Sequence, residues 1–410
     1  MKTRMFFSFL LATSLVLAVC EAQAQGFVRR VNCTRGQTIT RALQLFDDNP
    51  ITIQVQGTCN ENVLIVRDDV TLIADPSGGT VNGANPNEDT ITVRAARTVI
   101  NGLTVTGGGS GIVVLGSATI QNCIVQNAGH SGISFYHGGQ GTVDKCTVQN
   151  NGDYGIAIEA ASATVTNSTI SSNRKRGIIV TLGGGARIGV TTLPEYAGNT
   201  ISNNGGDGIL VSSSGSAFIG GNTINGNGTN LSSGFGGFGI EIESASAVVV
   251  GFNSITGNSA SGIFARSSSV QIGTPAFGLP ITGAFANVIT GNGASAPETP
   301  GGIFGFLGSS LGIQSATING NTGSGIILSL RSTGWLFDST VNNNTGNGIQ
   351  LVYGGDLVLP GPSPEYPPVT VTGNTLFGLQ CYGAKASIVG NTSGILGNTG
   401  GDVSPSCTGF

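Results

Sequence analysis

Hydrophobic and polar residues alternate in a short motif that recurs along most of the chain. The motif opens with Gly, continues with Ile or Leu, and then alternates for a few residues. Its copies start at positions 111, 132, 155, 177, 208, 239, 262, 302, 325, 348 and 378, and read GIVV, GISF, GIAI, GIIV, GILV, GIEI, GIFA, GIFG, GIIL, GIQL and GLQC. Most intervals are 21 to 23 residues, and the longer ones indicate insertions. A repeat of this length is typical of a solenoid.

Each period predicts three short strands separated by corners of Gly and Asn, as in ATIQNCIVQN and SAFIGGNTINGN. Strand alternation places Ile133, Phe135, Ile156 and Ile158 in a core. Asn and Gly tolerate the left-handed backbone of sharp corners, and Asn at one corner of successive turns can hydrogen-bond as a ladder. No turn buries its apolar face alone, so the turns are expected to stack about 4.8 Å apart as a parallel β-helix.

Low charge supports a repeat whose apolar residues are buried by stacking. Charged residues make up 9% of the chain, against about 25% in an ordinary soluble domain, and mean hydropathy is +0.21. The net charge is −4, and residues 174–176 form the one basic cluster. This distribution argues against nucleic acid as a partner.

The first 24 residues predict a secretory signal peptide. Lys2 and Arg4 form a basic region, residues 6–19 are apolar, and residues 22–24 read Ala-Gln-Ala, a cleavage pattern. No later segment is apolar for long enough to cross a bilayer. We therefore expect an exported protein, secreted or periplasmic, without a membrane span.

Residues from about 50 to 400 resemble the right-handed parallel β-helix repeat proteins of the pectate-lyase-like superfamily. The run TITRALQLFDDNPITIQVQGTCNENVLIVRDDVTLIAD is similar to the opening of that superfamily, where a short helix caps the barrel. Thr38 as N-cap, with Ile39, Ala42, Leu43 and Phe46 on one face, fits such a helix.

The resemblance implies an all-β fold: a right-handed parallel β-helix of about eleven or more turns with a short N-terminal capping helix. We divide the chain into a signal peptide (1–24), an N-terminal cap segment (25–50) and the β-helix domain (51–410). The superfamily includes lyases, hydrolases, epimerases, esterases and adhesins, so the fold leaves the activity open.

Six cysteines remain once Cys20 is removed with the signal, an even number in a compartment that permits disulfides. Pairing neighbours in the sequence would close both ends of the molecule and join two adjacent turns. The predicted pairs are Cys33–Cys59, Cys123–Cys146 and Cys381–Cys407. For Cys123 and Cys146, free stacked thiols are the alternative, because both face the core.

Outward positions of the first strand of each period predict one patch over three successive turns. Its members are Glu241, Glu243, Phe264, Arg266, Phe304 and Phe306. The insertions at 228–237 and 291–302 enter just before that strand and could wall it. Aromatic rings beside carboxylates suit a polysaccharide.

Two carboxylates can also perform glycoside hydrolysis, and strand geometry places the Cα atoms of Glu241 and Glu243 about 6.8 Å apart. The alternative is a surface ion pair between Glu243 and Arg266, with the phenylalanines covering a loop.

A second candidate site holds one of the two histidines in the chain. Stacking would align His130, Asp153 and Lys175, with Arg174 nearby, in successive turns. A base, a carboxylate and a cation could abstract the proton beside a uronate carboxylate, as lyases and epimerases do. The alternative is a charge-compensated corner in solvent. His137 points to another face or corner.

Several signatures of related enzymes are missing, among them the paired aspartates of polygalacturonases and the acidic calcium ligands of pectate lyases. The GGDGI segment at 205–209 resembles a calcium repeat but occurs once, whereas such a site needs consecutive copies. Asp153 alone is too little for calcium. We therefore expect no cofactor.

Three further insertions, at 182–198, 272–287 and 358–369, lie on one edge of the coil and place Tyr196 and Tyr366 on one side. These edge loops could contact a protein partner.

The function most in keeping with the sequence is binding or processing of an extracellular or cell-envelope polysaccharide. If the protein is an enzyme, a polysaccharide lyase or glycoside hydrolase is expected. The alternative is a non-catalytic structural or adhesive surface protein that displays loops on a β-helix scaffold.

Overall fold

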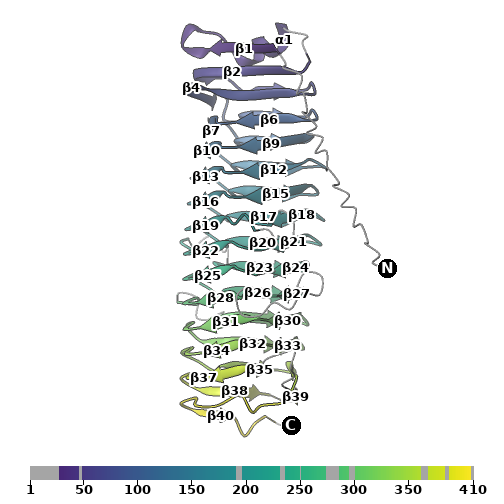
Figure 1. The fold of residues 1–410 in the computed structure, drawn as a ribbon, viewed down its shortest axis with the longest axis vertical. Helices are drawn as coiled ribbons and strands as arrows, with labels where there is room; N and C mark the ends of the chain where they lie inside the picture. Colours follow the sequence, from purple (N-terminus) through teal and green to yellow (C-terminus); the bar gives the residue numbers. More distant parts are fainter. Residues whose placement is uncertain are drawn as a thin grey trace, which may run out of the picture.

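The protein is a column of stacked β-strands (Figure 1). The computed structural model describes residues 27–45, 49–190, 196–230, 236–249, 251–273, 286–294, 301–361, 368–383 and 387–407. The predicted signal peptide therefore lies outside the described residues. Within these ranges the strands form two parallel sheets, of 26 and 14 strands. The larger sheet consists of two rows of strands, so the column has three faces.

The first row is the 14-stranded sheet and contains the Gly-Ile motifs. Its strands are β3 (Val63–Ile65), β5 (Ile91–Val93), β8 (Ile112–Val114), β11 (Ile133–Tyr136), β14 (Ile156–Glu159), β17 (Ile178–Thr181), β20 (Ile209–Ser212), β23 (Ile240–Glu243), β26 (Ile263–Arg266), β29 (Gly301–Phe306), β32 (Ser324–Ser329), β35 (Ile349–Val352), β38 (Phe377–Tyr382) and β40 (Gly401–Val403).

The second row follows the first along each coil. Its strands are β6 (Thr98–Asn101), β9 (Ser117–Gln121), β12 (Gln140–Asp144), β15 (Ser162–Thr166), β18 (Gly185–Ile188), β21 (Ser216–Ile219), β24 (Ser246–Val249), β27 (Ser269–Ile272), β30 (Ser310–Gln314), β33 (Thr333–Phe337), β36 (Asp356–Leu359) and β39 (Ser387–Gly390).

The third row completes each coil after a sharp corner. Its strands are β7 (Thr104–Gly107), β10 (Ile124–Gln126), β13 (Thr147–Gln149), β16 (Thr169–Ser171), β19 (Thr200–Ser202), β22 (Thr223–Asn225), β25 (Ser254–Thr256), β28 (Asn287–Thr290), β31 (Ala316–Asn319), β34 (Thr340–Asn342) and β37 (Thr370–Thr372). At the N-terminal end, β1 (Phe27–Asn32) pairs with β2 (Ile51–Asn60), and β2 with β4 (Val70–Gly83). The long strand β4 pairs with both β6 and β7, which joins the second and third rows.

Alternation along the strands builds one continuous core inside the column. Ile133, Phe135, Ile156 and Ile158 are fully buried, as the sequence predicts. The buried cluster extends from Val31 to Cys407, because every coil contributes apolar side chains and the next coil covers them.

Buried asparagines at the end of the third row form the predicted ladder. In each rung the side-chain Nδ2 donates to the Oδ1 of the Asn one coil later; the bond from Asn227 to Asn258 and the bond from Asn258 to Asn292 are both 2.9 Å. The ladder comprises Asn151, Asn173, Asn204, Asn227, Asn258, Asn292, Asn321, Asn344, Asn374 and Asn398. It satisfies polar groups that would otherwise be buried without partners.

The ladder also explains why the motif begins with glycine. A Cβ on Gly239 would lie 2.5 Å from Ile255 Cγ2 and 2.9 Å from Asn258 Nδ2. No side chain fits between the first strand and the asparagine that it packs against.

The helix α1 (Ile39–Leu45) closes the N-terminal end of the core, as predicted. The Thr38 hydroxyl accepts the Arg41 N–H at 3.2 Å, which makes Thr38 the N-cap. The Glu61 carboxylate accepts the N–H groups of Ile39 and Thr40 at 2.7 and 2.9 Å, so a negative charge lies at the helix N-terminus. The predicted contact of Phe46 lies outside the described residues.

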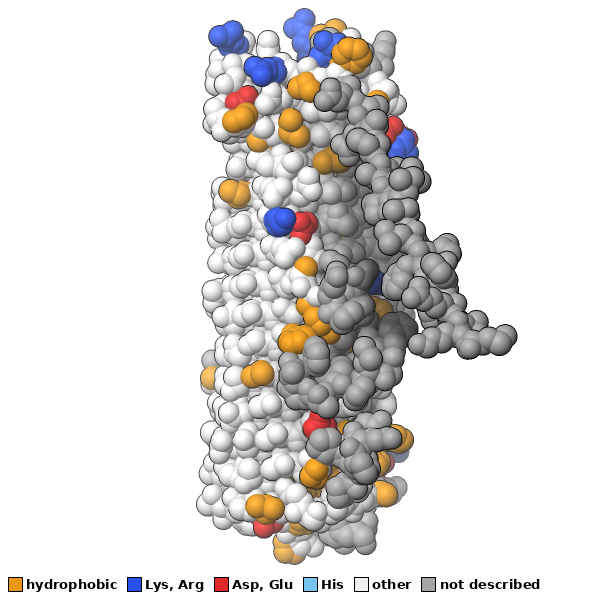
Figure 2. Space-filling model, viewed as in Figure 1, with side chains coloured by type: hydrophobic (Ala, Val, Ile, Leu, Met, Phe, Trp, Pro, Cys, Tyr) orange, Lys and Arg blue, Asp and Glu red, His pale blue; other side chains and the backbone are white. Residues whose placement is uncertain are grey.

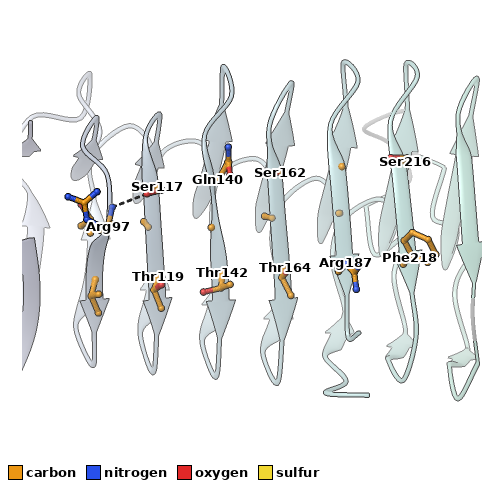
Figure 3. A pocket seen from close by; sticks show the side chains of 17 residues that line it. Arg97, Ser117, Thr119, Gln140, Thr142, Ser162, Thr164, Arg187, Ser216 and Phe218 are labelled. Carbon is orange, nitrogen blue, oxygen red and sulfur yellow. Dashed lines mark hydrogen bonds between the residues drawn. The ribbon is translucent and has the colours of Figure 1, made fainter. Parts of the chain in front are cut away.

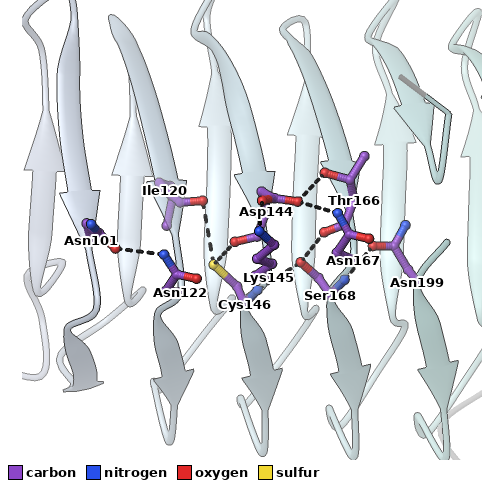
Figure 4. A network of polar contacts seen from close by, with 10 residues as sticks. All are labelled: Asn101, Ile120, Asn122, Asp144, Lys145, Cys146, Thr166, Asn167, Ser168 and Asn199. Atoms are coloured by element: carbon purple, nitrogen blue, oxygen red, sulfur yellow. Dashed lines mark hydrogen bonds and ion pairs between the residues drawn. The ribbon is translucent and has the colours of Figure 1, made fainter. Parts of the chain in front are cut away.

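Disulfides link Cys33 to Cys59 and Cys381 to Cys407, as predicted for the two ends of the molecule. The predicted Cys123–Cys146 disulfide is wrong, because both residues are buried free thiols. Each sulfur instead contacts backbone carbonyls: Cys123 Sγ lies 3.2 Å from Gln121 O, and Cys146 Sγ lies 3.3 Å from Asp144 O (Figure 4). The hydrogen bond with Cys123 and burial raise the pKa of the Cys146 thiol above its ordinary value. The alternative of stacked free thiols is therefore correct.

Candidate functional site

The outer face of the first row holds the predicted patch. Glu241, Phe264 and Phe304 occupy equivalent positions on β23, β26 and β29, and so do Glu243, Arg266 and Phe306. The rows expected from the motif spacing are thus the rows that the register forms. Figure 2 shows another face of the column, on which few charged side chains appear, in keeping with the low charge of the chain.

Four phenylalanine rings pack into one cluster on this face. The rings of Phe238 and Phe264 are stacked with centroids 4.5 Å apart, and Phe304 meets Phe264 edge-on at 5.4 Å. Phe306 lies 5.6 Å from Phe304. Phe264 is only 8% exposed, whereas Phe304 and Phe306 are half-buried. The ring surface available to a ligand is therefore that of Phe304 and Phe306, which Phe264 and Phe238 support from below.

The ion pair expected between Glu243 and Arg266 is present beside these rings. Glu243 Oε1 lies 3.2 Å from Arg266 Nη1, and both side chains are partly exposed. An ion pair of this kind contributes under about 1 kcal/mol to stability. Its two charges remain accessible to a ligand.

Glu241 of the patch also belongs to a buried charge network, whose other charged members, Arg176 and Asp207, lie in the two preceding coils. Arg176 Nε lies 2.6 Å from Asp207 Oδ2, and Arg176 Nη2 lies 3.5 Å from Glu241 Oε2. The Asp207 side chain is 0% exposed and that of Glu241 is 11% exposed. Asp207 Oδ1 also accepts the Phe238 N–H at 2.9 Å, which connects the network to the ring cluster. Charges buried to this extent need partners, and here each has one.

The surroundings of Glu241, one other carboxyl group and one guanidinium, shift its pKa. Burial, the nearby charge of Asp207 and a hydrogen bond with Asp207 raise the pKa of Glu241 to about 9, although Arg176 opposes the shift. A carboxylate in low dielectric beside another carboxylate is disfavoured, which gives the direction of the shift. Glu241 therefore carries a proton at neutral pH.

Arg176, Asp207 and Phe238 are the members of the site that the sequence analysis did not select. All three stand one residue before the motif glycine, in successive coils. The position two residues after the glycine, which holds Glu241, lies against them. Counting the residue before the motif glycine in each successive coil would have revealed this row. The segment GGDGI, which contains Asp207, was compared with a calcium repeat instead.

The histidine corner forms as the stacking predicts. Asp153 contacts Lys175 Nζ at 2.6 Å and His130 Nδ1 at 3.4 Å, and Lys175 Nζ lies 5.5 Å from the centre of the Tyr154 ring. The His130 side chain is 70% exposed. His137 lies at the next corner, with its ring 6.3 Å from that of Tyr136. The corner is solvated and separate from the buried network.

Among the described residues, one group has the spacing of metal ligands, namely Cys33, Cys59 and Glu61. Its two sulfurs form a disulfide and its carboxylate binds the N-terminus of α1. The group therefore offers no set of ligands for an ion.

Parts of the predicted walls and edge loops lie outside the described residues, at 231–235, 295–300, 191–195, 274–285 and 362–367, and Tyr366 is among them. The flanking strands show that the three edge insertions leave the column between the second and third rows, at one corner. The ring of Tyr196 packs edge-on against Phe252 at 4.9 Å.

Comparison with known proteins supports the architecture. The family model described as the right-handed beta helix region matches residues 54–193 and 160–274. The A-module of mannuronan C-5 epimerase AlgE6 from Azotobacter vinelandii has a TM-score of 0.52 and 14% identity, covering 89% of this chain and 93% of that chain. PfbA, a surface adhesin of Streptococcus pneumoniae, has a TM-score of 0.46 and 12% identity, covering 83% and 94%. No curated protein matches the chain in sequence.

Proposed function

Because this chain belongs to the right-handed β-helix family, whose fold leaves the chemistry to the side chains it displays, we propose that it binds and processes a polysaccharide on the outer face of the first row. The contact surface consists of Glu243, Arg266, Phe304 and Phe306. The observation that carries the proposal is the position of the largely buried Glu241, beside Arg176 and in one row with Phe264 and Phe304. Strongly perturbed carboxyl groups beside a ligand surface are characteristic of functional sites.

Each part of the surface suits one feature of a sugar chain. The half-buried rings of Phe304 and Phe306 offer apolar area against which the C–H faces of a sugar can stack. Glu243 and Arg266 supply an acceptor and a donor for hydroxyl groups. The ring stack beneath them fixes the surface in place before a ligand arrives, which lowers the ordering cost of binding.

The processing step that the geometry favours is glycoside hydrolysis. Glu241 can donate a proton to a leaving oxygen because it retains one at neutral pH. Glu243, two residues further along β23, would supply the second carboxyl group that this reaction needs. Lyase chemistry at His130, Asp153 and Lys175 is the second reaction to test, since a base, a carboxylate and a cation meet there.

We further propose that the protein acts outside the cytoplasm. The two disulfides require an oxidising compartment, in keeping with the predicted signal peptide at 1–24. None of the helices in the described ranges has the length and apolar character needed to span a bilayer. We propose no nucleic-acid partner. Contact between the edge loops and a protein partner stays a prediction.

A glycan array on the mature chain tests the binding step. We expect the wild type to bind at least one polysaccharide, and the Phe304→Ala/Phe306→Ala variant to lose at least tenfold in affinity. Phe252→Ala is the matched control, because it removes an exposed ring at another corner. Circular dichroism checks that all variants are folded.

Two further results separate hydrolysis, binding alone and a scaffold role. If the wild type releases product from the glycan, and Glu241→Gln and Glu243→Gln still bind it but release none, the hydrolysis assignment holds. If the wild type binds the glycan without releasing product, the protein only binds it. If no glycan binds the wild type, the protein is instead a structural or adhesive scaffold, and the edge loops become the surfaces to study.

A further inference from the structure

A hollow lies on another face of the column, away from the first-row site. It has a volume of about 730 Å³ and crosses the outer face of the second row from β6 to β21 (Figure 3). Six strands span about 24 Å at the usual spacing between strands. The hollow is thus a groove that runs along the axis of the column.

Hydroxyl and amide groups line this groove in two parallel rows. One row follows the register through Thr119, Thr142, Thr164, Arg187 and Phe218. The neighbouring row follows Ser117, Gln140, Ser162, Gly185 and Ser216. Figure 3 shows both rows facing the same side of the sheet. A chain with regularly spaced hydroxyl groups could meet the same set of partners at every coil.

Between the two outward rows, small residues of the same strands face the core. Ala118, Gly141, Ala163 and Ala186 occupy equivalent positions and line the groove. Farther along the column the same position holds larger residues, Val270 and Leu311 among them. Ala247 on the next strand, β24, is also small, so this row does not set where the groove ends; the groove lies between the two outward rows, over the backbone of the strands.

Charge and aromatic surface are concentrated at the two ends of the groove (Figure 3). Arg97 marks one end, and its guanidinium pairs with Asp69 at 2.6 Å. At the other end the Arg187 guanidinium lies 5.8 Å from the centre of the Phe218 ring, which is 42% exposed. None of the described residues that line the groove carries a carboxylate.

One buried polar group beneath the groove has no partner among the described residues. Thr98 is 1% exposed and lines the groove, and its hydroxyl makes no hydrogen bond within the described part of the chain. A buried hydroxyl without a partner costs about 1–3 kcal/mol. Thr98 pairs in register with Ala118, a core position, so this hydroxyl faces the interior of the column and does not take part in ligand binding.

We propose that this groove is a second glycan-binding site, which holds an extended segment of an acidic polysaccharide along the column axis. The hydroxyl rows bind the sugar hydroxyls, Phe218 stacks on one sugar ring, and Arg187 binds a carboxylate of the same or the next sugar. This inference does not depend on the first-row site, because the two surfaces share no residue.

Other extended polymers fit the groove less well. A peptide strand would need unpaired backbone groups, but the strands below the groove already pair with neighbours on both sides. A nucleic acid needs a stripe of basic residues, whereas the groove has two arginines at opposite ends, and Arg97 is engaged by two aspartates.

Calorimetric titration with two probes tests the proposal, using a hexamer of galacturonate as the acidic glycan and cellohexaose as the neutral one. We expect the wild type to bind the galacturonate hexamer at least tenfold more tightly than cellohexaose. Arg187→Gln and Phe218→Ala should each weaken binding of the hexamer at least tenfold. Thr142→Trp, which fills the middle of the groove from an exposed position, should abolish it.

Two controls separate this site from the first-row site. Trp335→Ala removes an exposed ring at the equivalent position of β33, beyond the groove, and Phe304→Ala/Phe306→Ala alters only the first-row site; neither should weaken binding in the groove. The proposal is overturned if the hexamer does not bind, if Thr142→Trp leaves binding unchanged, or if only the first-row variant abolishes it. Equal binding of cellohexaose would overturn the acidic class of ligand.

Discussion

Replacing Glu241 by Gln should change how the stability of the protein depends on pH. The folded state raises the pKa of Glu241 from 4.5 to about 9, so folding takes up a proton at any pH between these values. The stability from this group is therefore fully present below pH 4.5 and is lost as the pH rises through 9. Gln is a neutral side chain of the same shape as the protonated acid, and it has no proton to lose.

The size of the effect comes from the linkage between proton binding and folding. Each pH unit between the two pKa values changes the free energy of unfolding by about 1.4 kcal/mol. Between pH 5 and pH 8 the wild type should lose up to about 4 kcal/mol relative to Glu241→Gln. Burial supports a large effect, because only 11% of the Glu241 side chain reaches solvent.

Urea unfolding at pH 5, 6, 7 and 8, followed by circular dichroism, measures this difference. Glu243→Gln is the matched control, since it removes a partly exposed carboxyl two residues away on the same strand. Parallel curves for the wild type and Glu241→Gln would refute the assignment of the proton. Parallel curves are also what an ionised Glu241 bound to Arg176 would give, because no proton is then taken up on folding between pH 5 and pH 8.

Three other predictions concern the column itself. Asn258→Ala removes a side chain that accepts two hydrogen bonds and donates two, so we expect a loss of about 3–5 kcal/mol in urea unfolding; a loss below about 1 kcal/mol would contradict the importance of the ladder. Gly239→Ala places a Cβ 2.5 Å from a core side chain and should lower the free energy of unfolding by about 1–3 kcal/mol in the same assay. Unchanged stability would mean that the first-row strand can shift to make room for the added methyl group. Cys123 and Cys146 should not react with a thiol reagent in the folded protein, and the reagent should detect two thiols per chain in denaturant without reductant. If it detects none in denaturant, the two cysteines form a disulfide after all.

The fold could be predicted from the sequence because one repeat period determines the positions of the strands, the corners and the core residues together. The motif glycines placed Ile133 and Ile156 in the core and Glu241 and Phe264 on the outer face, and the register agrees. Stacking makes residues of successive coils neighbours, so counting from one glycine gives the contacts along a row.

Contacts between different rows were harder to predict. Asp207 reaches Glu241 across a corner, and the distance across a corner depends on side-chain direction, which a linear count does not give. The groove of the second row was missed for a related reason. Its Ser and Thr residues have the same pattern as any solvated strand face, so the sequence does not distinguish the groove from other outward faces.

The asparagine ladder allows the length of each coil to vary without disturbing the column. Asn204 and Asn227 are 23 residues apart, and Asn258 and Asn292 are 34 residues apart, yet both pairs are joined by bonds of 2.9 Å. The chain is thus returned to the same register after every excursion, however long. Loops at the corners can be lengthened, shortened or exchanged between coils while the faces that they border stay aligned, so binding surfaces on this scaffold can change independently of the structure that supports them.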